Sequence, residues 1–263
     1  MAAESGKIDP MHQFQVEPLF GHDWQIAGHS IAFTNSSLWM LFTLLVVWLF
    51  MLGGMKRQLV PGRWQAAVEG VTGFITNMME TNIGPAGRKF VPYVFSLFMF
   101  ILVANLLGLL PFGIIPGVHP FTVTSHLTVT AVLAIVSFSI VLIVGFAKHG
   151  FHFFSLFVPH GAPWWMMPIL VPVEFVSFMV RPFSLALRLF VAMTAGHILL
   201  KVLAGFVING ANAEALWVAP VVSLPSLILM IGISALELLV AAIQAYVFAL
   251  LTSLYLNDAI NLH

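Results

Sequence analysis

The segment from residue 172 to 201, PVEFVSFMVRPFSLALRLFVAMTAGHILLK, is almost wholly apolar but contains Glu174, Arg181, Arg188 and His197. An ionised group at the centre of a bilayer costs at least about 2.5 kcal/mol, so such groups usually line a polar path or meet a partner. Because arginine is not deprotonated in proteins, we expect Arg188 to stay positive. The segment therefore indicates a functional site inside a membrane.

Helical spacing divides these groups between two faces. Glu174, Arg181 and Arg188 are separated by seven residues each and project from nearly the same face of one helix. His197 lies nine residues beyond Arg188, which is about 13.5 Å further along the axis and on the opposite side, at roughly 100° per residue. One helix thus presents a cationic stripe in one direction and a titratable imidazole in another.

The composition is that of a protein embedded in lipid. Of the 263 residues, 60% are hydrophobic and only 8% are charged, whereas about a quarter of a soluble domain is charged. Ten basic and ten acidic residues leave zero net charge, which offers no field for binding nucleic acid. The absence of Cys excludes disulfides, thiol chemistry and iron–sulfur ligation. We predict an all-α polytopic membrane protein with about five membrane-crossing helices and one interfacial helix.

The order of polar and apolar stretches predicts an extramembrane arm over residues 1–36 and a single transmembrane helical domain over residues 37–263. The expected crossings are 37–52, 92–110, 125–146, 166–206 and 220–255. Residues 61–84 are too polar to span and are interpreted as an interfacial helix or a polar loop. The last two crossings exceed the roughly 20 residues that a span needs, so we expect a strongly tilted, antiparallel hairpin.

Basic residues set the expected orientation, because cytoplasmic loops carry an excess of Lys and Arg. With five crossings, one side of the membrane receives Lys56, Arg57, Arg63, Arg88, Lys89 and Lys148. The loops on the other side, residues 111–124 and 207–219, contain no Lys or Arg. We therefore predict that the N-terminus lies outside and the C-terminus in the cytoplasm.

The last crossing supplies partners for the charged segment. Glu237 and Gln244 are seven residues apart and share one helix face. In an antiparallel hairpin that sets Arg188 level with Gln244, His197 approaches Glu237 to within a helical turn. Because His197 and Arg188 point in opposite directions, this pairing requires a bent or obliquely crossing hairpin.

Several motifs resemble those of a known family. They are SLALRLF at 184–190, TAGH at 194–197 and ELLVAAIQAYVFALLTSLYL at 237–256, with Pro172, Glu174 and Pro182 upstream. Together they resemble subunit a of the bacterial F-type ATP synthase membrane sector, F0. The likeness covers residues 39–255 and is most specific over residues 172–255.

This resemblance implies a stator subunit beside a rotating ring of c subunits, each with one carboxylate in the membrane. Arg188 takes the place of the family's indispensable arginine, and His197 and Glu237 match a pair whose residue types exchange positions between branches of the family. The other matches to polar positions along the ion path are Asn105, Glu174, Ser184 and Gln244. Ala192 departs from the family pattern, which usually has Asn at this position.

The implied mechanism uses two offset half-channels within residues 166–256, which carry protons to and from the c-ring and couple proton translocation to ATP synthesis. The resemblance further implies a subunit that is not catalytic by itself and that holds no cofactor or metal. Its expected partners are the c-ring, the peripheral-stalk b subunits and the lipid bilayer. The expected location is the inner (plasma) membrane of a bacterium, within a hetero-oligomeric complex.

The same residues also permit structural roles. His197 and Glu237 can form a plain interhelical hydrogen bond, and Gln244 and Asn105 can link helices. Ser184 can bond its own helix backbone, which the sequence slightly favours. Arg181 and Glu174 also have structural interpretations. Arg181 can contact lipid headgroups, and Glu174 can lie in the first turn of a helix, where acidic residues are favoured.

Two other functions compete with the stator. A proton-coupled secondary transporter of an anionic substrate would bind that substrate at Arg188, but the chain shows no internal repeat. A haem- or quinone-binding subunit would need histidines on facing helices at mid-depth. We interpret three histidines instead as surface residues of a loop: His149, His152 and His160.

Overall fold

The fold was analysed in a computed structural model, which describes residues 16, 18, 24–26, 29–55, 60–110, 121–158, 164–212 and 219–261. Parts of the predicted arm 1–36 and of the loops 111–124 and 207–219 lie outside the described residues. The same holds for Lys56, Arg57 and His160. Within the described ranges the chain consists of helices and one short two-stranded sheet.

Five helices in the described ranges are long and apolar enough to cross a membrane. They are α1 (Asn35–Gly54), α3 (Val91–Leu109), α4 (Leu127–His149), α5 (Met167–Ala211) and α6 (Leu224–Ile260). Each lies on one of the five predicted crossings, with boundaries that differ by a few residues. The predicted all-α polytopic fold is confirmed.

The polar segment after α1 forms a helix, α2 (Arg63–Ile83), where the sequence left open a helix or a loop. Ile75 and Met79 on one face of α2 are completely buried, which explains why this amphipathic segment is helical. The Trp64 indole Nε1 donates to the Phe50 carbonyl of α1 at 2.9 Å. Gly84 ends α2 with φ of 79°, and a 3₁₀ helix, η2 (Pro85–Phe90), leads into α3.

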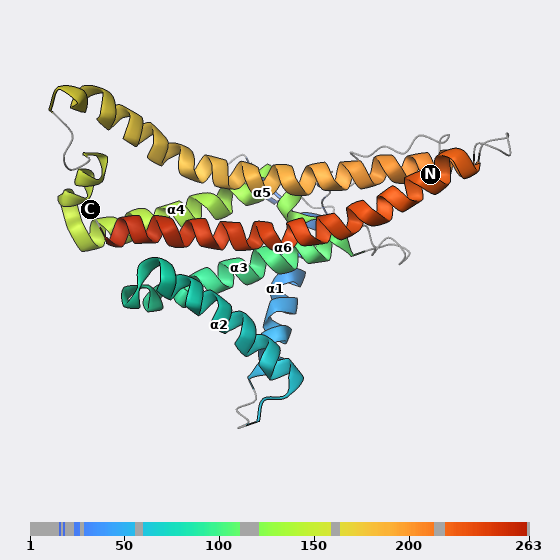
Figure 1. The fold of residues 1–263 in the computed structure, drawn as a ribbon, viewed down its shortest axis with the longest axis horizontal. Coiled ribbons are helices and arrows are strands. Elements are labelled where there is room, and N and C mark those ends of the chain that lie inside the picture. The colour runs from blue at the N-terminus through green and yellow to red at the C-terminus, as the bar shows by residue number, and fades with distance from the viewer. Residues whose placement is uncertain are drawn as a thin grey trace.

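The last two helices set the long dimension of the molecule. Figure 1 shows α5 and α6 running antiparallel, with α3 and α4 beside them and α1 crossing at a steep angle. They contain 45 and 37 residues, which at 1.5 Å per residue corresponds to about 68 and 56 Å. Because the hydrocarbon core of a bilayer is only about 30 Å thick, helices of this length lie obliquely in it.

Helix α6 is attached to a different helix at each end. A single π-helical turn, η7 (Ala219–Ser223), precedes it, and the Ser223 hydroxyl donates to the Val207 carbonyl of α5 at 3.0 Å. At the other end the Ile260 carbonyl accepts from Lys148 Nζ at 2.8 Å and from His149 Nε2 at 3.0 Å. These donors satisfy an orphan carbonyl of the last turn, and the Lys148 ammonium places positive charge at the negative end of the helix dipole.

The remaining elements are short. The strands β1 (Trp24–Ile26) and β2 (His29–Ile31) pair antiparallel. The 3₁₀ helices η4 (Val123–Ser125), η5 (Gly150–Phe157) and η6 (Trp164–Met166) lie at the ends of longer helices. The main hydrophobic core is shared by helices α2 to α6. Its fully buried side chains include Met79, Ile101, Leu189, Met193 and Phe248.

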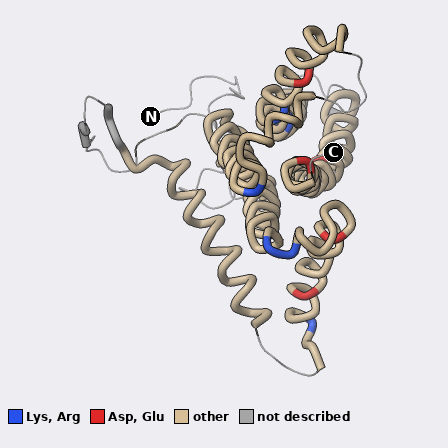
Figure 2. Tube along the Cα trace, turned by 90° about the vertical axis from the view of Figure 1, so that its left-hand side faces the viewer, with Lys and Arg blue, Asp and Glu red and all other residues tan. Residues whose placement is uncertain are grey.

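Charged side chains are sparse along the helices, as Figure 2 shows. Large apolar side chains such as Leu41, Ile143 and Ile231 are exposed instead. A soluble protein rarely exposes so much contiguous apolar surface, so these faces suit contact with lipid or with other membrane subunits.

Candidate functional site

The hairpin brings His197 of α5 and Glu237 of α6 together. The imidazole Nδ1 lies 3.7 Å from Glu237 Oε1, and the two side chains are only 10% and 3% exposed. This distance exceeds a hydrogen bond, so the plain interhelical hydrogen bond is not formed. The predicted approach of His197 to Glu237 is confirmed, although the two groups are not hydrogen-bonded to each other.

The Glu237 carboxyl is buried without a hydrogen bond. Among the described residues neither of its oxygens has a hydrogen-bond partner. Gly196 of α5 lies directly against it, since a Cβ at that position would approach Glu237 Cδ to 2.8 Å. A buried carboxyl without a partner carries a high desolvation cost, which is typical of a group that exchanges a proton rather than one that holds a fold together.

A threonine occupies the other side of the imidazole. Thr122 Oγ1 lies 2.7 Å from His197 Nε2. One turn earlier on α5, the Thr194 hydroxyl donates to the Ser125 carbonyl at 3.3 Å. The turn η4 is thereby held against α5 at two positions on one helix face.

Asn105 links three elements. Its Nδ2 donates to the Ala241 carbonyl of α6 at 3.1 Å, and its Oδ1 accepts from the Thr124 hydroxyl at 2.7 Å. The side chain is completely buried. Asn105 therefore connects α3 to both α6 and η4, as expected for a residue that links helices, and its partner Ala241 lies one helical turn beyond Glu237 on α6.

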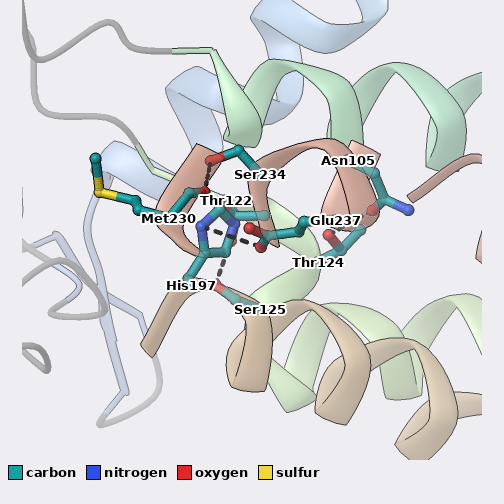
Figure 3. A network of polar contacts seen from close by, with 8 residues as sticks. All are labelled: Asn105, Thr122, Thr124, Ser125, His197, Met230, Ser234 and Glu237. Carbon is teal, nitrogen blue, oxygen red and sulfur yellow. Dashed lines mark hydrogen bonds and ion pairs between the residues drawn. The ribbon is translucent and has the colours of Figure 1, made fainter. Parts of the chain in front are cut away.

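These residues form one polar cluster between α3, η4, α5 and α6, and Figure 3 shows all of its members except Thr194. We define the polar cluster as Asn105, Thr122, Thr124, Ser125, Thr194, His197 and Glu237. Three of the seven are predicted as site residues from the sequence: Asn105, His197 and Glu237. The other four lie on or against the segment 122–125, most of which falls in the predicted loop 111–124, although its hydroxyl-rich run TVTS was a usable signal.

Arg188 lies outside this cluster. Its side chain is exposed. The neighbouring side chains of Leu185 and Leu189 are buried, so they pack their side of α5 into the core. In the part of the chain that the structure describes, Arg188 has no hydrogen bond or ion pair, and the predicted pairing with Gln244 is not formed. The guanidinium thus projects from a surface that includes the exposed apolar side chains of Phe183 and Val191.

Arg181 has a partner that the sequence did not suggest. Its Nη1 lies 2.7 Å from Asp258 Oδ2 on α6, so the pair closes the end of the hairpin opposite the polar cluster. The guanidinium also lies over the rings of Phe178 and Tyr255, at 5.5 and 5.2 Å from the centroids. From the sequence we expected Arg181 only to contact lipid headgroups, so its attachment to α6 was not predicted.

The other candidate residues lie apart from the cluster. The Ser184 hydroxyl donates to the Arg181 carbonyl of its own helix at 3.0 Å, which agrees with the structural interpretation. Glu174 and Gln244 are half-buried and form no hydrogen bond or ion pair with any described residue. No group of three His, Asp or Glu side chains in the described ranges could hold a metal ion.

Known proteins resemble this chain over almost its whole length. Residues 37–257 match the model of a family described as ATP synthase A chain. A protein named ATP synthase subunit a from Rhizorhabdus wittichii is 75% identical over 263 residues, covering 100% of both chains. A protein of the same name from Sphingopyxis alaskensis is 71% identical over 263 residues, again covering 100% of both chains. Another from Rhodospirillum rubrum is 47% identical over 255 residues, which cover 97% of this chain and 99% of the relative.

Proposed function

This chain belongs to the ATP synthase A chain family, and from that premise we propose that it is the stator that passes protons to and from a rotating ring of c subunits. The chain is a multi-pass bacterial membrane protein and a component of ATP synthase, a hetero-oligomeric complex that couples proton transport to ATP synthesis. In this proposal it carries no catalytic site of its own and conducts protons for the complex.

The observation that carries the proposal is the charge of Arg188, which is unpaired among the described residues and lies on an exposed, largely apolar face of α5. Against lipid such a charge costs at least about 2.5 kcal/mol, whereas a ring carboxylate that passes it removes that cost. The guanidinium favours the ionised form of this carboxylate, so the ring releases its proton before passing. The same charge repels a proton that would otherwise run straight through.

The polar cluster supports an inlet from the outer side. Glu237 is buried, lacks a hydrogen bond among the described residues and lies beside the imidazole of His197, so it can accept a proton and hand it on. Asn105 is the third member of this inlet in our proposal. Its side chain holds α3, η4 and α6 in register around the carboxyl.

The outlet is proposed to lie on the cytoplasmic side of Arg188. Glu174 is half-buried and unpaired among the described residues, which suits a group at the wall of a water-filled path. Ser184 and Gln244, both half-buried, complete the polar positions between Glu174 and the inlet. The two half-channels fall within residues 166–256 of the transmembrane domain 37–263, which follows the arm 1–36.

The oblique hairpin explains why the two paths stay separate. At 1.5 Å per residue, His197 and Glu174 lie about 13.5 and 21 Å from Arg188 in opposite directions along α5. Because α5 is oblique, much of this separation runs parallel to the membrane, so the two paths are offset sideways. A proton then crosses only by travelling with the ring, and each charge contributes about 2.3 kcal/mol per 100 mV of membrane potential.

The orientation follows from the basic residues. Lys148 bonds the Ile260 carbonyl, so this basic residue and the C-terminal end of α6 lie on one side. We propose that this side is the cytoplasm of a bacterium, with the chain in the inner membrane and its N-terminus outside. The c-ring and the peripheral-stalk b subunits are the proposed partners.

Replacing Arg188 tests the proposal. In inverted membrane vesicles that contain the complete complex, we expect Arg188→Lys and Arg188→Ala to lower proton-driven ATP synthesis by at least about 100-fold, the range lost when one preorganised charge is removed. Lysine is a poor substitute because an ammonium on an apolar face within the membrane loses its proton far more readily than a guanidinium.

The matched control is Arg181→Lys. Arg181 lies on the same helix but is already paired with Asp258, so this variant should keep most of the synthesis rate. The amount of assembled complex is measured in every membrane by immunoblotting. Normal synthesis in either Arg188 variant would refute the proposal.

A further inference from the structure

The turn η4 contacts the functional helices at three places. Thr122, directly before η4, meets His197, and the Ser125 carbonyl accepts from Thr194 of the same helix. Thr124 bonds Asn105 of α3. A turn held from two sides in this way cannot shift without moving the imidazole environment.

The hydrogen bond between Thr122 and His197 fits either tautomer of the ring, and the surroundings of the hydroxyl favour one direction. In the described part of the chain Oγ1 of Thr122 bonds no other group, so Nε2 is the acceptor available to its proton. The hydrogen bond made by one ring nitrogen decides which nitrogen carries the proton in a neutral imidazole. A hydroxyl that donates to Nε2 therefore leaves the ring proton on Nδ1, which faces Glu237 Oε1 at 3.7 Å.

The packing around Thr122 is tight and depends on a glycine. Gly108 of α3 lies against it, because a Cβ at that position would approach Thr122 Cγ2 to 2.6 Å and Cβ to 2.8 Å. Both Thr122 and His197 are buried, so few alternative rotamers remain for the hydroxyl. The absence of a side chain at Gly108 is what lets Thr122 sit beside the ring.

We propose that Thr122 is a positioning residue that sets the tautomer of His197 and so directs the Nδ1 proton at Glu237. This inference rests on the proposed function, because it assumes that His197 and Glu237 conduct protons. With the opposite tautomer a lone pair on Nδ1 would face the carboxylate and repel it. Thr122 thereby keeps the pair ready for proton exchange without touching the proton that crosses.

The test compares three variants in the complete complex. Thr122→Val removes the hydroxyl but keeps the shape, and we expect passive proton conduction through F0 to fall about 3- to 10-fold, as for the loss of one buried hydrogen bond. Thr122→Ser restores the hydroxyl and should conduct within about twofold of the parent chain. The matched control is Thr252→Val, because Thr252 is completely buried and its hydroxyl, within the described ranges, bonds only the Phe248 carbonyl of its own helix.

A second measurement separates positioning from simple packing. If Thr122 acts through His197, then Thr122→Val should add nothing to the loss caused by His197→Ala, whereas independent effects multiply. Gly108→Ala offers another route, because its new methyl displaces the Thr122 side chain, and it should reproduce the Thr122→Val defect. It serves as the test if Thr122→Val does not assemble.

Wild-type conduction in assembled Thr122→Val would overturn the inference. So would equal loss in the Ser and Val variants, or multiplicative losses with His197→Ala. None of these outcomes bears on Arg188, whose replacement tests the stator function itself, so the two proposals can fail separately.

Discussion

The two ends of the α5–α6 hairpin each hold a base–acid pair, and the two pairs are built in opposite ways. Arg181 and Asp258 touch at 2.7 Å with side chains 23% and 35% exposed. His197 and Glu237 stay 3.7 Å apart although both are almost fully buried. The better solvated pair is closed and the buried pair is open, the reverse of what stability alone would select. In our proposal the first pair attaches the two helices and the second pair exchanges protons.

Within this comparison of the two pairs, the largest effect is expected at the open pair. Glu237→Gln keeps the size of the side chain but cannot exchange a proton, so we expect proton conduction to fall at least about tenfold, with normal assembly. ATP-driven acidification of inverted vesicles measures it. Glu80→Gln is the control, since Glu80 pairs with Arg88 at an exposed site. Parental pumping in Glu237→Gln would remove the open pair from the path and erase the contrast between the two ends.

An intermediate effect, on stability, is expected at the support of the open pair. Asn105→Ala leaves the Ala241 carbonyl and the Thr124 hydroxyl without their partner, which costs about 1–3 kcal/mol for a buried polar group. The midpoint of thermal inactivation of the purified complex should fall. Asn261→Ala is the control, because the Asn261 side chain is exposed and, as far as the structure describes the chain, bonds only Asn257 one turn earlier. An unchanged midpoint would show that Asn105 is not needed to hold the cluster.

The smallest effect is expected at the closed pair. Asp258→Asn removes the charge of a partly solvated ion pair, so we expect a loss of only about 0.5–1 kcal/mol, with coupled transport retained. The Phe178 and Tyr255 rings still hold Arg181 in this variant. The same thermal midpoint, measured beside ATP synthesis, checks both parts. A collapse of synthesis with an unchanged midpoint would give the closed pair a transport role and reverse the comparison.

The sequence was sufficient to predict features that depend on periodicity. Apolar length located the five crossings, and antiparallel spacing brought His197 to Glu237, as the 3.7 Å separation confirms. The level pairing of Arg188 with Gln244 came from the same register but is not formed in the described residues. Spacing fixes the position along an axis but not the rotation of one helix against another, and only packing decides that rotation.

Contacts between distant segments could not be predicted in the same way. Thr122 meets His197 across 75 positions and Arg181 meets Asp258 across 77. Neither Thr122 nor Asp258 stands out, because a hydroxyl in a connecting turn and an acid near a chain end are ordinary residues there. Their importance arises only from the fold that brings them to a charged or titratable partner.

The attachment of α6 at both ends has a mechanical meaning. A rotor that turns past a stator pushes sideways on it, and a long rod held at one end bends far more under a side load than a rod held at both. Ser223 joins the start of α6 to α5, while Lys148 and His149 hold Ile260 at its end. A rod supported at both ends resists deflection at its middle, so in the proposed stator the neighbouring helices would bear the torque instead of letting it be lost as flexing beside the ring.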